Sequence, residues 1–181
     1  KEGFTKLDIQ YNNKYKRLKR SQKQLKTEKE QREAAAEDDE VLLHCLGDNL
    51  QSEKDIKEWE LTEWTKEEED KMTNEAFEWI RVDADFEWIC KIHINQPDYM
   101  YASQLQQDRA VEAQMESISY FANSNPSATY STILLRTLMD SRYYYGVRVE
   151  AALGMAKFAK EQVNWIGSKH LLMAFKHLFC F

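Results

Sequence analysis

The hydrophobic positions of this chain follow two different periods, and the change comes at about Pro97. Between residues 78 and 94, apolar side chains stand at alternate positions, which is typical of strands with one buried face. After Pro97 they recur three or four residues apart, which is typical of helices that bury one face. We therefore expect an α+β chain with a β-rich part up to residue 96 and a helical part over 97–181.

The β-rich part consists of two short runs, residues 78–82 and 86–94, joined by Asp83-Ala84-Asp85. An aspartate that opens a turn accepts hydrogen bonds from the backbone, so we predict a β-hairpin over residues 76–96. A hairpin alone is marginally stable, and we expect this one to be the end of a larger sheet. Two tryptophans are expected in its core: Trp79 and Trp88.

The first 75 residues combine one short predicted strand with a long charged stretch. Residues 4–11 alternate between apolar and polar side chains and predict a strand over 1–11. The net charge is +7 over residues 1–32, −12 over 33–75 and −1 over the rest, within a total of −6. Because residues 12–75 hold few large apolar anchors, we predict a charged insertion that is mostly disordered.

Four helices are expected after Pro97, and short loops between them favour two antiparallel pairs, the beginning of an α-solenoid. Helix-capping residues and the apolar period place their starts at Asp108, at Asn125-Pro126, at Arg142 and at Asn164 or Ser168. In the last helix we expect four residues to face inward: Leu171, Leu172, Phe175 and Leu178.

The stretch Val147-Arg148-x-x-Ala151-Ala152-Leu153 is typical of the second helix of a HEAT repeat. Its small residues allow a neighbouring helix to come close. In such repeats the arginine pairs with an acidic group a few residues earlier, so we predict a contact between Arg148 and Asp140. The motif favours a HEAT- or armadillo-like solenoid.

Composition narrows the cellular setting. The sequence does not begin with methionine and stops within an apolar helical pattern, so we expect a fragment of a longer protein. It contains no run of eighteen apolar residues, and we expect no membrane contact. Three widely spaced cysteines without a CxxC motif favour reduced thiols in the cytosol or nucleus: Cys45, Cys90 and Cys180.

Two sequence elements carry a resemblance to a known family. They are Trp-Ile-Arg-x-Asp at residues 79–83 and Gln-x-Asp-Arg-x-Val-x-Ala-Gln at 106–114. Together with the runs over 143–159 and 169–180, they resemble the family of TFIID subunit 2, the large TBP-associated factor with an aminopeptidase-like body. The resemblance is close to the fungal members.

This resemblance implies a position within a larger architecture. In the related zinc aminopeptidases, a catalytic domain is followed by a β-sandwich and then by a helical HEAT-like domain. The hairpin over 76–96 would then close the sandwich, and residues 97–181 would begin the solenoid. The family implies a non-catalytic nuclear scaffold that binds TBP and other TBP-associated factors and contributes to core-promoter DNA binding at the initiator.

Two other functions compete with this interpretation: the C-terminal part of a true zinc aminopeptidase, and a generic HEAT-repeat adaptor. Zinc peptidase chemistry needs His-Glu-x-x-His, which this sequence lacks. His170 and His177 are separated by about 10 Å along a helix, too far to chelate one ion. We therefore expect no enzyme activity, no metal or other cofactor and no small-molecule substrate.

A basic block is the feature that suggests nucleic-acid binding. Seven cations within thirteen residues can neutralise several phosphates without reading base sequence. The alternative is a solvated tail, or one that contacts the acidic segment after it. The candidate DNA-binding residues are Lys14, Lys16, Arg17, Lys19, Arg20, Lys23 and Lys26.

Aromatic residues suggest partner-binding sites. Trp59 and Trp64 stand in an otherwise acidic segment and form either a docking motif for a partner or an anchor onto this chain's own sheet. Tyr143 and Tyr144 belong to a tyrosine run that either packs between helices or contributes to a partner surface. These four residues are the candidate partner-binding residues.

Overall fold

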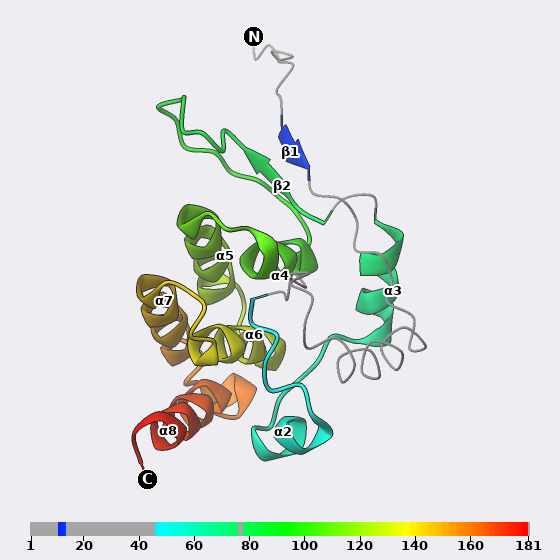
Figure 1. The fold of residues 1–181 in the computed structure, drawn as a ribbon. Coiled ribbons are helices and arrows are strands. Elements are labelled where there is room, and N and C mark those ends of the chain that lie inside the picture. The colour runs from blue at the N-terminus through cyan, green and yellow to red at the C-terminus, as the bar shows by residue number, and fades with distance from the viewer. Residues whose placement is uncertain (1–10, 14–45, 76–77, 181) are drawn as a thin grey trace, which may run out of the picture.

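The computed structural model describes residues 11–13, 46–75 and 78–180. Within these ranges the chain is mostly helical, with one pair of very short strands (Figure 1). The predicted strand over residues 1–11 lies outside the described residues except for Tyr11. The elements in order are β1 (Tyr11–Asn13), α2 (Glu53–Glu58), α3 (Lys66–Asn74), β2 (Ile80–Val82), α4 (Asp98–Gln107), α5 (Val111–Asn123), α6 (Ala128–Met139), α7 (Tyr145–Ala156), η1 (Glu161–Val163) and α8 (Ile166–Phe179).

The strands β1 and β2 pair in antiparallel fashion although nearly seventy residues separate them in the sequence. The register places Tyr11 opposite Val82 and Asn13 opposite Ile80. The second strand therefore finds its partner early in the chain and not in the run that follows it.

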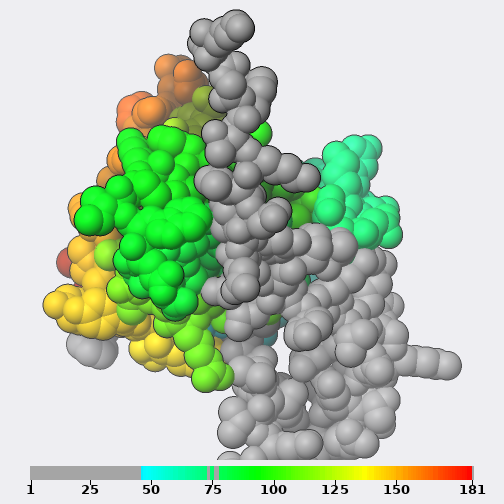
Figure 2. Space-filling model, turned by 90° about the horizontal axis from the view of Figure 1, so that it is seen from above, coloured from blue at the N-terminus to red at the C-terminus, as the bar shows by residue number. Residues whose placement is uncertain are grey.

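The predicted β-hairpin over residues 76–96 is wrong, because residues 86–94 form no strand. Asp83 and Phe86 both adopt positive φ angles of 55°. The Asp83 carboxylate accepts hydrogen bonds from the backbone N–H groups of Glu87 (2.9 Å) and Trp88 (3.1 Å), so these donors are not available to a strand ladder. The chain forms a projecting loop instead, seen in green at the surface in Figure 2.

This loop separates the two tryptophans that we expected together in a hairpin core. Trp79 is 1% exposed, and its burial is confirmed. Trp88 is 47% exposed, and Phe86 and Ile89 beside it are also exposed, so the prediction of a buried Trp88 is wrong.

Helices α4–α8 pack in succession and are called the helical array below (Figure 1). Helix α4 contacts α5, helices α5 and α6 contact α7, and α8 contacts α6 and α7. The predicted helices correspond to α5, α6, α7 and α8. Helix α4 was missed, because Ser103, Gln104 and Gln106 interrupt the apolar spacing of a helix that nevertheless has six buried residues.

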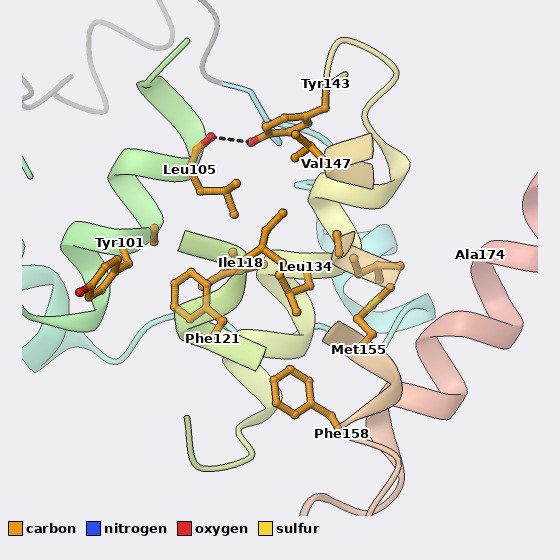
Figure 3. Close-up of a cluster of buried hydrophobic side chains, with 14 of the residues drawn as sticks. Tyr101, Leu105, Ile118, Phe121, Leu134, Tyr143, Val147, Met155, Phe158 and Ala174 are labelled. Atoms are coloured by element: carbon orange, nitrogen blue, oxygen red, sulfur yellow. Dashed lines mark hydrogen bonds between the residues drawn. The ribbon is translucent and has the colours of Figure 1, made fainter. Parts of the chain in front are cut away.

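The core of the helical array is one cluster of side chains from helices α4 to α8 and the segments beside them (Figure 3). Leu105, Phe121 and Leu134 are completely buried in it. Gly154 lets α7 approach closely, because an added Cβ would lie 3.0 Å from Leu134 Cδ1 and 3.3 Å from Ala122 Cβ. As expected from the sequence, a small residue on this helix lets its neighbours lie close to it.

The inward face predicted for α8 is wrong at three of its four residues, and the fourth, Leu171, packs against the core. Leu172, Phe175 and Leu178 are exposed and Leu171 is half-buried. The buried residues are Ile166, Gly167, His170 and Ala174. The fully buried positions of α8 thus include two small residues and a hydrogen-bonded histidine, while Leu172, Phe175 and Leu178 point outward.

The predicted contact between Arg148 and Asp140 is also not formed. Arg148 Nε donates instead to the carbonyl oxygen of Leu138 at 2.8 Å, which satisfies an acceptor in the last turn of α6. The Asp140 carboxylate is already bound by the Arg142 side chain and by the backbone N–H of Gly47.

Residues 46–75, which we predicted to be mostly disordered, form helices and pack on the array. Ser52 caps α2, and Thr65 with Glu68 forms a capping box at the start of α3. Trp59 and Leu61 are 6% and 8% exposed within the main core cluster. Four further apolar side chains of this segment pack half-buried against the same cluster, so the array supplies the surface that stabilises it: Leu46, Leu50, Ile56 and Trp64.

We predict that Gly167→Ala lowers the free energy of unfolding by about 1–3 kcal/mol, the usual cost of overpacking. A Cβ at this position would lie 2.1 Å from the Met155 carbonyl oxygen and 2.9 Å from the Phe158 carbonyl carbon, both in backbone that cannot move aside cheaply. Gly146→Ala is the matched control, since its Cβ meets the movable ring of exposed Tyr144. Urea unfolding measures both variants, and equal stability of the two would contradict the packing described for α8.

Candidate partner-binding site

Residues 46–64, called the arm below, run along the helical array and are tied to it by backbone hydrogen bonds (Figure 1). At its beginning, Leu46 N donates to Gln106 O at 2.9 Å, and Gly47 N donates to Asp140 Oδ2 at 2.7 Å. Near its end, Thr62 N donates to Thr132 Oγ1 at 3.0 Å. The arm therefore contacts the end of α4, both ends of α6 and, as shown next, α8.

His170 on α8 fixes the middle of the arm. Its Nε2 lies 2.9 Å from the carbonyl oxygen of Trp59, and its Nδ1 lies 2.8 Å from Ser131 Oγ on α6. A carbonyl oxygen can only accept, so Nε2 carries the proton and Nδ1 accepts from the serine hydroxyl. Burial lowers the pKa of His170, which is 0% exposed, so the ring is neutral near pH 7.

Two ion pairs flank this buried contact. Arg136 on α6 binds both carboxylate oxygens of Glu63 and also donates to the carbonyl oxygen of Leu50 at 3.2 Å. Lys169 on α8 pairs with Glu60 at 2.9 Å. Positive side chains of the array thus bind the acidic arm on each side of the buried contact at Trp59.

Asp140 binds the first residues of the arm, at the end away from His170. Burial acts to raise the pKa of its carboxyl, but hydrogen bonds from Arg142 and from Gly47 N outweigh burial and lower the pKa below its usual value. The carboxylate is therefore ionised at neutral pH and holds the start of the arm against the end of α6.

A second junction joins β2 to the array, and it is built from the two family-like sequence elements. Asp108, after α4, accepts hydrogen bonds from Trp79 Nε1 and Arg81 Nη1, each at 3.3 Å. Its other carboxylate oxygen accepts from Ala110 N, and its carbonyl accepts from Gln114 Nε2 at 2.8 Å. The two elements that looked specific in the sequence therefore meet at one partly buried carboxylate.

Gln96 and Gln104 extend this junction as a chain of buried amides. Gln96 accepts from Ile80 N at 3.2 Å and donates to Gln104 Oε1 at 3.3 Å. Gln104 in turn donates to the carbonyl oxygen of Ala113 at 2.9 Å and to Glu116. These bonds connect β2 through α4 to α5, alongside the apolar packing of Trp79 on Tyr99 and Met100 of α4.

The predicted partner-binding residues fall into different environments. Trp59 is buried and Trp64 is half-buried, and both pack on this chain's own helices rather than on its sheet. Tyr143 is buried and donates to the carbonyl oxygen of Leu105 at 3.0 Å (Figure 3). Tyr144 is half exposed and stacks loosely on exposed Tyr145, so it is the candidate that a partner can reach.

The seven predicted DNA-binding residues, from Lys14 to Lys26, lie outside the described residues. The structure does not place them relative to the arm or the array.

Between α5 and α7 there is a groove of about 290 Å³, with Met115, Ile118 and Leu153 among its lining residues.

Further exposed apolar side chains lie on the last helices of the array. The exposed side chains are Tyr145, Val149 and Leu153 on α7 and Leu172, Phe175, Leu178 and Phe179 on α8. Sequence periodicity placed three of these side chains, Leu172, Phe175 and Leu178, in the core, and so it did not predict an exposed apolar surface on α8.

Among the described residues, no group of three or more His, Cys, Asp or Glu side chains is arranged to hold a metal ion. The same part of the chain contains no helix that is long and apolar enough to cross a membrane.

Packed helices with an arm docked on them define the class of this chain, a helical-repeat protein. Family models agree. The model described as "TAF2 Ig-like domain" matches residues 1–97, and that described as "TAF2-like, TPR repeats" matches residues 98–181. The chain belongs to the TFIID subunit 2 (TAF2) family, and its helices are TPR-like rather than HEAT- or armadillo-like.

Individual relatives carry the same name. Transcription initiation factor TFIID subunit 2 of Schizosaccharomyces pombe is 53% identical over 183 residues, which cover 100% of this chain and 16% of that protein. The Saccharomyces cerevisiae protein is 42% identical over 194 residues, covering 99% of this chain and 13% of its own length. The Drosophila melanogaster protein is 33% identical over 56% of this chain and 8% of its own length. The chain thus spans about a sixth or less of these relatives.

We predict that Asp108→Ala lowers the free energy of unfolding by about 1–3 kcal/mol, because it leaves Trp79 Nε1 and the Arg81 guanidinium without their acceptor. Asp85→Ala, at an exposed position of the nearby loop, is the matched control and is expected to change stability by less than about 0.5 kcal/mol. Chemical denaturation tests the pair. An Asp108→Ala variant as stable as the control would contradict the junction.

The His170 contact predicts a pH dependence. Since the folded pKa is lowered, the unfolded chain takes up this proton first, so stability is full above about pH 6.5 and is lost as the pH falls, by at most about 1.4 kcal/mol per pH unit. The charged group that acts on the ring is Glu60, which pairs with Lys169, and the His177 ring contacts the Trp59 ring.

His170→Asn should therefore lose less stability than the wild type between pH 7 and pH 5, measured by urea unfolding at each pH. His177→Asn, at an exposed position of the same helix, should keep the wild-type dependence. Identical pH profiles for His170→Asn and the wild type would show that the ring is not held neutral.

Proposed function

We propose that this chain is a non-catalytic scaffold segment of a TFIID subunit, working in the nucleus by joining an Ig-like part to TPR-like helices and presenting their surfaces to other TFIID subunits. The observation that carries this proposal is the pair of junctions at Asp108 and His170. Both are built from hydrogen bonds and ion pairs between the part matched by the Ig-like model and the part matched by the TPR model. Such junctions hold two sets of surfaces in one geometry, as assembly of a large complex requires.

The partners that we propose are TBP and the other TBP-associated factors, together with core-promoter DNA contacted through the whole complex. The printed name of the relatives, TFIID subunit 2, supports membership in such a complex. Exposed Tyr144 on the array and exposed apolar side chains on α7 and α8 are surfaces of the kind that protein partners cover.

Affinity purification of the full-length protein from nuclear extract tests the assembly. We expect TBP and TBP-associated factors in stoichiometric amounts by mass spectrometry. Purification of a protein free of these partners, with hydrolysis of aminoacyl substrates, would contradict the scaffold function and favour a zinc aminopeptidase.

For DNA, we propose that the basic block from Lys14 to Lys26 contacts phosphates without reading base sequence. Replacing its seven cations with glutamine should weaken promoter binding by TFIID at low salt. It should also reduce the slope of log K against log salt by about 0.9 for each phosphate that the segment no longer neutralises.

The matched control replaces four lysines of the neighbouring acidic region with glutamine: Lys54, Lys57, Lys66 and Lys71. Filter binding or fluorescence anisotropy across a salt series measures both assemblies. An unchanged slope for the basic-block variant would remove this segment from the DNA interface.

A further inference from the structure

The stretch Trp59-Glu60-Leu61-Thr62-Glu63-Trp64 lies on the array in the manner of a bound peptide. No helix or strand includes any of these six residues. Two of the side chains, Trp59 and Leu61, are buried against helices that follow some seventy or more residues later in the chain. The side chains that receive the stretch are called the seat below: Thr132, Arg136, Lys169, His170 and His177.

The seat recognises main chain as well as side chains. His170 donates to the carbonyl oxygen of Trp59, and Thr132 Oγ1 accepts from the backbone N–H of Thr62. Contacts to backbone groups are available to any extended peptide. Side-chain selectivity comes from the apolar places filled by Trp59 and Leu61, with the Trp59 ring 5.6 Å from that of His177.

Charge makes the seat selective for an acidic peptide. Arg136 and Lys169 lie on either side of the buried centre and pair with Glu63 and Glu60. Arg136 Nε is buried and has no hydrogen-bond partner within the described part of the chain, so the guanidinium retains a donor for another acceptor.

The attachment of the arm is also suited to exchange. Helix α2 packs on the core through half-buried Ile56, and α3 does so through half-buried Met72. No described side chain of either helix is fully buried, so the flanking helices hold residues 59–64 without a buried anchor of their own. Glu60 has a left-handed φ of 51°, which is unfavourable for a residue with a side chain. Its ion pair with Lys169 is exposed and therefore weak.

We propose that the seat between α6 and α8 is a peptide-binding site, which the arm occupies within its own chain until a partner's peptide replaces it. The partner is an acidic segment of another protein with aromatic and aliphatic anchors spaced like those of residues 59–64. Binding removes the arm from the array and so couples partner recognition to release of the preceding segment. This inference does not depend on which complex the protein joins.

The test uses a fluorescein-labelled peptide with the sequence of residues 57–66, KEWELTEWTK, and fluorescence polarisation against the full chain. The arm competes in the wild type. In the Glu60→Lys/Glu63→Lys variant both ion pairs become repulsive at exposed positions, and the peptide should bind at least about tenfold more tightly. Equal affinity for the wild type and this variant would overturn the proposal.

Adding Lys169→Glu to that variant is the matched control. The new glutamate pairs with the lysine introduced at position 60 and repels the peptide's own glutamate, so affinity should return to the wild-type level. A peptide with serine in place of both tryptophans and the leucine should not bind. A triple variant that still binds about tenfold more tightly than the wild type, or any binding of the serine-substituted peptide, would show nonspecific association and contradict the seat.

A measurement on the wild type keeps the proposal testable if the variant does not fold. The backbone N–H of Thr62 bonds to Thr132 Oγ1, so its hydrogen exchange reports whether the arm lies in the seat. Excess peptide should accelerate this exchange severalfold while the amides of α6 keep their protection. Unchanged exchange at saturating peptide, or a concentration-dependent dimer that takes up no peptide, would overturn the proposal, the latter by assigning the seat to a second copy of the chain.

Discussion

The neutral imidazole of His170 is the contact on which the arrangement of this chain most depends. It joins α8, α6 and the arm through two hydrogen bonds in a site without solvent access. Because each ring nitrogen has one partner of the correct type, a polar group is buried without the cost of an unsatisfied donor or acceptor. The contact also decides which face of α8 points inward, and so which of its apolar side chains remain on the surface.

Two carboxylates complete the framework at positions away from His170. Asp108 binds Trp79 and Arg81 from the strand segment, and Asp140 binds Gly47 at the start of the arm. Each lies just after a helix of the array, where the chain leaves regular structure and its backbone groups need partners. The part of the chain matched by an Ig-like model is thus held to TPR-like helices by directional polar contacts, which define geometry more strictly than apolar packing.

Sequence periodicity predicted helices α5 to α8, because their apolar residues recur at helical spacing and pack within the same array. It did not predict the arm, since Trp59 and Leu61 are too few to suggest a folded segment and gain their stability from a surface distant in sequence. It failed after β2, where the Asp83 carboxylate binds Glu87 N and Trp88 N and forms a loop in an alternating sequence. The sequence showed the two elements that form the junction at Asp108. That they contact each other could be learned only from the three-dimensional structure.

Hydrogen–deuterium exchange on the full-length protein tests the central claim, that the arm and the helical array form one folded unit. The amides of Gly47 and Thr62 bond to Asp140 and Thr132, and neither belongs to a helix or strand of its own. Both amides should exchange far more slowly than those of an unstructured chain. Exchange of both amides at the rate of an unstructured peptide, with α6 still protected, would contradict the claim.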